Sequence, residues 1–204
     1  MRAHPGPTAS SVLRLDPQVQ YFTGRGFAVV DVDYSGSTGY GRAFRESLYG
    51  RWGLDDVADC AAVAEHLVAA GRAVAGQVFI RGASAGGYTA LRAVSQEGPF
   101  AAGVAVSAVV DPARWAQRAP RFQRPLAARL LGGAVTASEV RTPVLLIHGT
   151  DDAVVPADDV LALADGLRSR GAPCEVLLLQ GVGHDVADAG LEAELRLYQQ
   201  IIAA

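Results

Sequence analysis

The fold can be predicted from one segment of the chain, Val78-Phe79-Ile80-Arg81-Gly82-Ala83-Ser84-Ala85-Gly86-Gly87-Tyr88. The apolar run at 78–80 predicts a buried strand, and a helix is expected directly after the glycines, from about 85 to 95. A Gly-x-Ser-x-Gly motif between a strand and a helix is typical of a nucleophile elbow, in which glycines permit a sharp turn that raises the Ser84 hydroxyl above the sheet. The amide of Ala85 would then stabilise an oxyanion. The alternative is a glycine-rich turn that carries a solvated serine.

Short apolar runs alternate with longer helical patterns on both sides of this motif. Predicted strands cover 27–33, 78–80, 104–110, 143–147 and 175–179, and predicted helices cover 54–70, 85–95, 155–169 and 191–202. This alternation predicts an α/β fold whose mostly parallel sheet has helices on both faces. Residues 111–141 break the alternation, and we expect a small helical excursion there that could wall a pocket at the carboxyl ends of the strands.

Composition narrows the possible function classes. The chain has 204 residues, which suits one α/β domain, and 18 basic against 21 acidic residues give a net charge of −3, which argues against nucleic acid as the main partner. Cys60 and Cys174 form no metal spacing and no disulfide framework. No apolar run approaches the ~20 residues of a membrane span, and the first residues hold no apolar core of a signal peptide. We therefore expect a cytoplasmic protein that binds no membrane.

A serine nucleophile needs a base, and His184 is the best candidate. It follows the predicted strand 175–179 in the loop Gly181-Val182-Gly183-His184-Asp185, which can bring an imidazole over the serine of a neighbouring strand. A loop histidine without a catalytic role is the alternative. His148, at the end of the strand 143–147, is interpreted as a structural residue near the site rather than as the base.

The base in turn needs a carboxylate that fixes its tautomer. Asp151 and Asp152 both follow the strand 143–147, and either could orient His184. The order along the chain is then serine, aspartate, histidine, which is the order found in the α/β-hydrolase fold. Each gap is long enough to hold a strand and a helix, so the three side chains can lie on successive loops at one edge of the sheet.

Together these motifs resemble the catalytic domain of the prolyl oligopeptidase family of serine peptidases. The matching segments are His4–Pro7, Tyr34–Arg42, Trp52–Asp59, Gly82–Tyr88, Gly149–Pro156 and Gly183–His184. The combination is more specific than any of these motifs alone. It implies the α/β-hydrolase fold and a peptidase or related hydrolase that needs neither metal nor cofactor.

The resemblance assigns roles residue by residue. It makes Ser84 the nucleophile, Asp152 the orienting carboxylate and His184 the general base, with Asp151 as the runner-up to Asp152. The oxyanion hole would use the amide of Ala85 and a second donor from the loop His4–Pro7.

Within that loop Gly6 is the best second donor, because Pro5 has no N–H to donate. The ring of His4 is a weaker candidate. Val109, Trp115 and Tyr88 are the candidate residues for the substrate pocket, although packing in the core is the preferred interpretation of Trp115.

The sequence also departs from the family pattern. Ser35 stands where an arginine is usual, the N-terminal β-propeller is absent, and the strand expected before His4 is absent too. We therefore expect residues 1–204 to be one catalytic domain, truncated at its amino end, which could pair with the missing propeller domain or form a homo-oligomer. The implied function is hydrolysis of short peptides or of acylated amino-terminal residues. A carboxylesterase or general acyl hydrolase and an inactive fragment are the alternatives.

Overall fold

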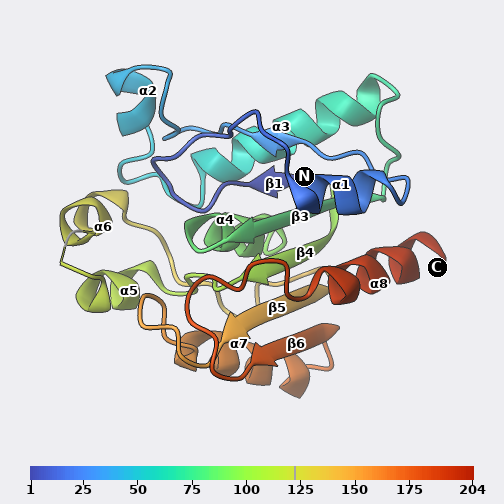
Figure 1. The fold of residues 1–204 in the computed structure, drawn as a ribbon. Helices are drawn as coiled ribbons and strands as arrows, with labels where there is room; N and C mark the ends of the chain where they lie inside the picture. Colours follow the sequence, from blue (N-terminus) through green and yellow to red (C-terminus); the bar gives the residue numbers. More distant parts are fainter. Residues whose placement is uncertain (122) are drawn as a thin grey trace.

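The computed structural model describes residues 1–121 and 123–204. Its centre is a six-stranded sheet in the order β2-β1-β3-β4-β5-β6, in which every neighbouring pair is parallel (Figure 1). The strands are β1 (Arg2–Ala3), β2 (Asp31–Val32), β3 (Val78–Ala83), β4 (Phe100–Val106), β5 (Val144–Gly149) and β6 (Cys174–Leu179). Since all strands run in one direction, their carboxyl ends share one edge of the sheet.

Helices cover both faces of this sheet. They are α1 (Pro17–Thr23), α2 (Arg42–Glu46), α3 (Asp55–Ala69), α4 (Ala85–Ala93), α5 (Pro112–Arg118), α6 (Arg124–Leu130), α7 (Asp158–Ser169) and α8 (Leu191–Ile202). Residues of α3, α4 and α7 belong to one core cluster, and residues of α1 and α8 belong to the other. The prediction of an α/β fold with helices on both faces is confirmed.

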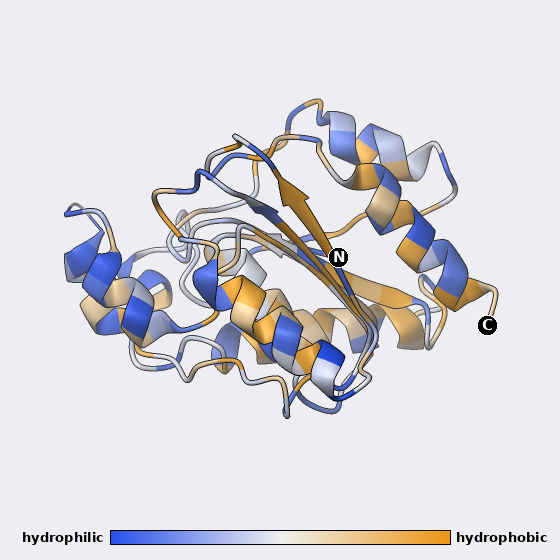
Figure 2. Cartoon of the chain, turned by 90° about the horizontal axis from the view of Figure 1, so that it is seen from below, coloured by the Kyte–Doolittle hydropathy of each residue, from blue (hydrophilic) through white to orange (hydrophobic). Residues whose placement is uncertain are grey.

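Alternation along the strands explains the two cores. Leu145 and Ile147 of β5 point into the core under α8, whereas Leu146, between them, points into the core under α4 and α7. Side chains alternate with a period of two in a strand, so a strand covered on both faces is apolar throughout. Figure 2 shows the result, with apolar strands in the interior and apolar helix faces turned toward them.

Two predicted strands have different bounds in the structure. The run 104–110 was expected to be one strand, but β4 ends at Val106, because Ser107 takes a φ of 44° and turns the chain out of the sheet. Residues Ala108–Val110 are nevertheless buried, which is why they resemble a strand in the sequence. Similarly, β2 is limited to Asp31–Val32 within the predicted run 27–33, because it pairs with β1, which has only two residues.

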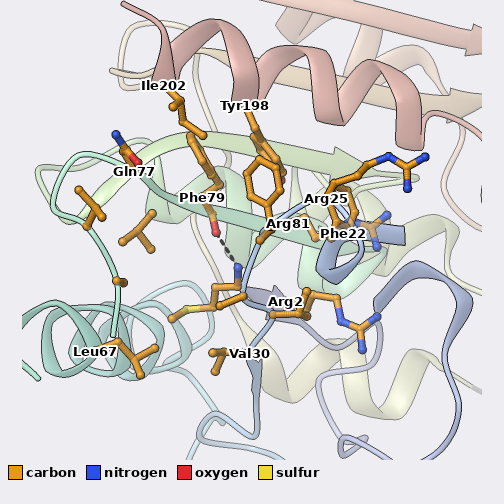
Figure 3. A pocket seen from close by; sticks show the side chains of 18 of the residues that line it. Arg2, Phe22, Arg25, Val30, Leu67, Gln77, Phe79, Arg81, Tyr198 and Ile202 are labelled. Atoms are coloured by element: carbon orange, nitrogen blue, oxygen red, sulfur yellow. Dashed lines mark hydrogen bonds between the residues drawn. The ribbon is translucent and has the colours of Figure 1, made fainter. Parts of the chain in front are cut away.

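The strand expected to be missing before His4 is present as β1, which lies between β2 and β3. The backbone nitrogen of Met1 continues its ladder and donates to Phe79 O at 2.8 Å. Met1 lies beside a cavity of about 560 Å³ at the amino ends of the strands, where Phe22, Phe79 and Tyr198 form part of the wall (Figure 3). This cavity is at the sheet edge opposite to Ser84.

Residues 111–141 contain the expected helical excursion, α5 and α6, beyond the carboxyl end of β4. Phe122, which belongs to this segment, lies outside the described residues. Across the part of the chain that the structure describes, no helix is both long and apolar enough to cross a membrane. The same residues contain no group of three or more histidine, cysteine or acidic side chains placed to hold a metal ion.

Candidate active site

Ser84 occupies a sharp turn between β3 and α4. Its φ and ψ are 53° and −116°, which is a strained conformation for a residue other than glycine. The turn requires the glycines on either side: a Cβ on Gly82 would lie 2.0 Å from the carbonyl oxygen of Gly86, and a Cβ on Gly86 would lie 2.3 Å from that of Ala3. The backbone therefore has the shape of a nucleophile elbow, with Ser84 at its tip.

Asp152 and His184 are brought together from two successive loops. His184 Nδ1 lies 2.8 Å from Asp152 Oδ2, while Oδ1 of the carboxylate accepts from the amides of Val154 at 2.9 Å and Val155 at 2.8 Å. The Asp152 side chain is fully buried and that of His184 is 30% exposed. Burial alone would raise the pKa of Asp152, but the nearby His148 ring, the His184 ring and the amide of Val155 outweigh it and hold this pKa well below its usual range.

The two candidate carboxylates, Asp151 and Asp152, have different partners in the structure. Asp151 is exposed, and its Oδ1 accepts from the hydroxyl of Thr150 at 2.9 Å. His184 is in contact with Asp152 instead. The close approach of the two loops depends on Gly149, where a Cβ would lie 2.2 Å from the carbonyl oxygen of Val182.

Ser84 and His184 share the wall of one cavity. This cavity has a volume of about 830 Å³ and is also lined by Val106, Ser107 and several residues between 9 and 18. It lies at the carboxyl ends of β3 and β4, the usual place for a ligand in an open parallel sheet. The structure thus brings His184 into contact with Asp152 and into the same cavity wall as Ser84, whereas no hydrogen bond joins Ser84 Oγ to the imidazole among the described residues.

The loop at the candidate oxyanion hole is firmly held. Tyr34 donates its hydroxyl to His4 O at 2.9 Å, and the two rings stack at 4.1 Å. The Ser37 hydroxyl donates to Tyr34 O, so His4 Nε2 must be the donor in its 2.7 Å contact with Ser37 Oγ. The N–H of a neutral His4 is therefore already used, and burial lowers the pKa of this ring. His4 acts as an anchor for the loop in this arrangement.

The amide of Ala85 was expected to be available for an oxyanion, but in the structure it already has a hydrogen-bond acceptor. It donates to Pro5 O at 3.1 Å. An oxyanion could take this hydrogen bond only after the Pro5 carbonyl turned away. Rotation of the peptide between Pro5 and Gly6 would do this and would also turn the N–H of Gly6, a residue without a Cβ to restrict it.

The three candidate pocket residues lie in the core. Tyr88 is fully buried and donates to Gly133 O at 2.8 Å, Val109 is 1% exposed, and Trp115 packs edge-on against Trp52 at 5.9 Å. None of the three lines the cavity that contains Ser84. The expectation is wrong because all three side chains belong to the core cluster that covers one face of the sheet, and for Val109 because the chain leaves β4 at Ser107.

One contact of the candidate site, between His148 and Asp152, was not predicted from the sequence. His148, interpreted as structural, is fully buried, and its Nε2 lies 3.3 Å from Asp152 Oδ2. The sequence does contain one sign of this contact: a polar residue follows an otherwise apolar strand, four residues before the carboxylate.

A strained serine after a parallel strand, followed along the chain by a buried carboxylate that binds a histidine, defines the α/β-hydrolase class of folds. Comparison with known proteins places the chain within that class. It belongs to the prolyl oligopeptidase family, whose model matches residues 13–202.

Similar proteins support this assignment. The crystal structure of a puromycin hydrolase superposes with a TM-score of 0.93 at 37% identity, over 100% of this chain and 34% of that one. A puromycin-hydrolyzing peptidase of Mycobacterium tuberculosis gives 0.92 and 37%, over 98% and 33%. An acylamino-acid-releasing enzyme of Arabidopsis thaliana is 24% identical over 89% of this chain and 26% of its own length. The chain thus spans about a third or less of the length of these relatives.

Proposed function

We propose that this chain carries the catalytic centre of a serine peptidase that hydrolyses short peptides or acylated amino-terminal residues. The observation that carries the proposal is the 2.8 Å contact between His184 Nδ1 and Asp152 Oδ2. That contact places a proton on Nδ1 and leaves Nε2 free to act as a base. Ser84, raised on its strained turn, lines the same cavity as His184.

The proposed reaction has two halves. Ser84 Oγ bonds to the carbonyl carbon of the substrate while His184 Nε2 takes the hydroxyl proton, and Asp152 stabilises the imidazolium that forms. The carbon–nitrogen bond then breaks, and His184 gives its proton to the departing amine. In the second half, water loses a proton to His184, attacks the acyl carbon and releases the acid, after which Ser84 regains its proton.

The developing oxyanion would be bound by the amides of Ala85 and Gly6. Because Ala85 now donates to Pro5 O, substrate binding must turn the Pro5 carbonyl away. A substrate oxygen that takes over this hydrogen bond gains charge in the transition state, so the contact strengthens as the reaction proceeds. This rearrangement would free the amide of Ala85 and so make the oxyanion hole able to bind the substrate oxygen.

We propose that residues 1–204 form one catalytic domain that works either with a propeller domain of a longer protein or with a second copy of the chain. Support comes from the relatives, of which this chain matches only a quarter to a third of the length.

The names of these relatives suggest the first substrates to test: an N-acetylated amino acid amide, a dipeptide amide and puromycin. The cavity of about 830 Å³ is large enough for ligands of this size.

Turnover of these probes tests the proposal. The chain should cleave the amide bond of at least one of them, and Ser84→Ala should abolish the reaction while it leaves the circular dichroism spectrum unchanged. A chain that cleaves nitrophenyl esters but none of the amides would instead be an esterase. A folded chain that cleaves neither would contradict the proposed function.

A further inference from the structure

His148 occupies a place that packing alone does not explain. It lies in β5 after Leu145, Leu146 and Ile147, with a side chain that is fully buried. Its Nε2 has two polar neighbours, Val155 O at 2.7 Å and Asp152 Oδ2 at 3.3 Å.

The acceptors around His148 fix its tautomer. A carbonyl oxygen can only accept, so the short contact with Val155 O places a hydrogen on Nε2. Nδ1 is then an acceptor in the neutral ring, and it is buried without a hydrogen-bond partner among the described residues. An unpaired buried acceptor costs stability, and an apolar side chain in β5 would avoid that cost. The presence of a histidine at this position is therefore better explained by the polar contacts of its Nε2–H than by packing.

That N–H joins two parts of the loop that presents the carboxylate. Val155 donates its amide to Asp152 Oδ1, and its carbonyl accepts from His148. His148 Nε2 also faces Oδ2, the same oxygen that is in contact with His184 Nδ1. The carboxylate is thus enclosed by donors on both oxygens, and His148 connects the loop to the rigid end of β5.

We propose that His148 is a positioning residue that acts through Asp152. Its Nε2–H holds Val155 and Oδ2 in a single arrangement, so that Oδ2 accepts from Nδ1 of His184 and not from another donor. Buried groups of this kind, one step removed from the reacting atoms, orient the groups that react. The proposal rests on the proposed function, since it gives His148 a part in that reaction.

Three substitutions of His148 separate positioning from packing. His148→Leu removes the donor and keeps the site apolar, His148→Gln keeps an N–H at about the reach of Nε2, and His148→Asn keeps an amide that is too short. We expect His148→Leu and His148→Asn to lower kcat about 10- to 100-fold with KM changed less than about twofold, and His148→Gln to recover most of the loss. A folded His148→Leu variant with wild-type kcat would overturn the proposal.

A double-mutant cycle tests whether the effect passes through Asp152. In an Asp152→Asn background, His148→Leu should lower kcat less than about threefold, because the interaction it supports is already lost. A loss as large as in the wild-type background would mean that His148 acts elsewhere, and would refute the proposed route.

A second readout does not need turnover. The proton between His184 Nδ1 and Asp152 Oδ2 should give a far-downfield ¹H resonance that persists in His148→Gln and moves upfield or broadens away in His148→Leu. An unchanged resonance in His148→Leu would refute the positioning role. If wild-type chain and Ser84→Ala turn over substrate equally, the proposed function fails, while this resonance still decides the role of His148.

Discussion

Asp152→Asn is the substitution whose outcome follows most closely from the geometry. Oδ1 of Asp152 accepts from the amides of Val154 and Val155, so an asparagine must place its carbonyl oxygen there. Its NH₂ group then faces His184 Nδ1, 2.8 Å from the present Oδ2. Because that group donates, Nδ1 must accept, and the proton of the neutral imidazole moves to Nε2. The histidine can then no longer take a proton from Ser84.

The size of this effect can be stated in advance. In a serine–histidine–aspartate triad the wrong tautomer costs about 10⁴-fold in kcat. Such a loss corresponds to about 5.5 kcal/mol of transition-state stabilisation. We expect this loss in the hydrolysis of a nitrophenyl ester or an amide probe by Asp152→Asn, with a fold that is retained because the two backbone amides keep their acceptor.

Asp151→Asn is the matched control. Asp151 is exposed and its carboxylate is in contact with Thr150, so this variant should keep activity within about threefold of the wild type. The reasoning would be refuted if Asp152→Asn retained activity within about tenfold of the wild type. It would also be refuted if Asp151→Asn lost the greater part of the activity.

Two further predictions concern stability. Burial raises the pKa of Asp56 from 3.8 to about 6, so its ionisation should cost about 3 kcal/mol of folding free energy as the pH rises through this window, and Asp56→Asn should remove that fall in urea unfolding. Gly86→Ala would place a Cβ 2.3 Å from Ala3 O, so thermal unfolding should show a loss of about 3 kcal/mol or more. Gly98→Ala, with no atom within 4 Å of the added Cβ, should change little, and equal losses would contradict the account of the elbow.

The main features of this fold and site could be predicted because they follow local rules. The alternation of strand and helix patterns predicted the parallel sheet, and the glycines around Ser84 predicted the turn that the structure shows. Chain order and strand ends predicted that His184 and one of two aspartates would lie near this turn.

Other features could not be predicted because they depend on contacts between distant segments. The hydrogen bond from Ala85 to Pro5 is set by how the first residues pass over α4, which no local pattern records. The contact between His148 and Asp152 depends on the rotamer of each side chain. The strand predicted over 104–110 ends early because the turn at Ser107 interrupts an apolar run without any glycine or proline to mark it.

The proposed function depends above all on Ser84 being a nucleophile that His184 activates, and covalent labelling provides a direct test. The folded chain should be incubated with a fluorophosphonate, and the adduct located by mass spectrometry of the intact chain and of its peptides. We expect one adduct per chain, on the peptide that contains Ser84, and a much slower reaction in His184→Ala. A folded chain that takes up no label, or that takes it up on another serine, would contradict this role of Ser84.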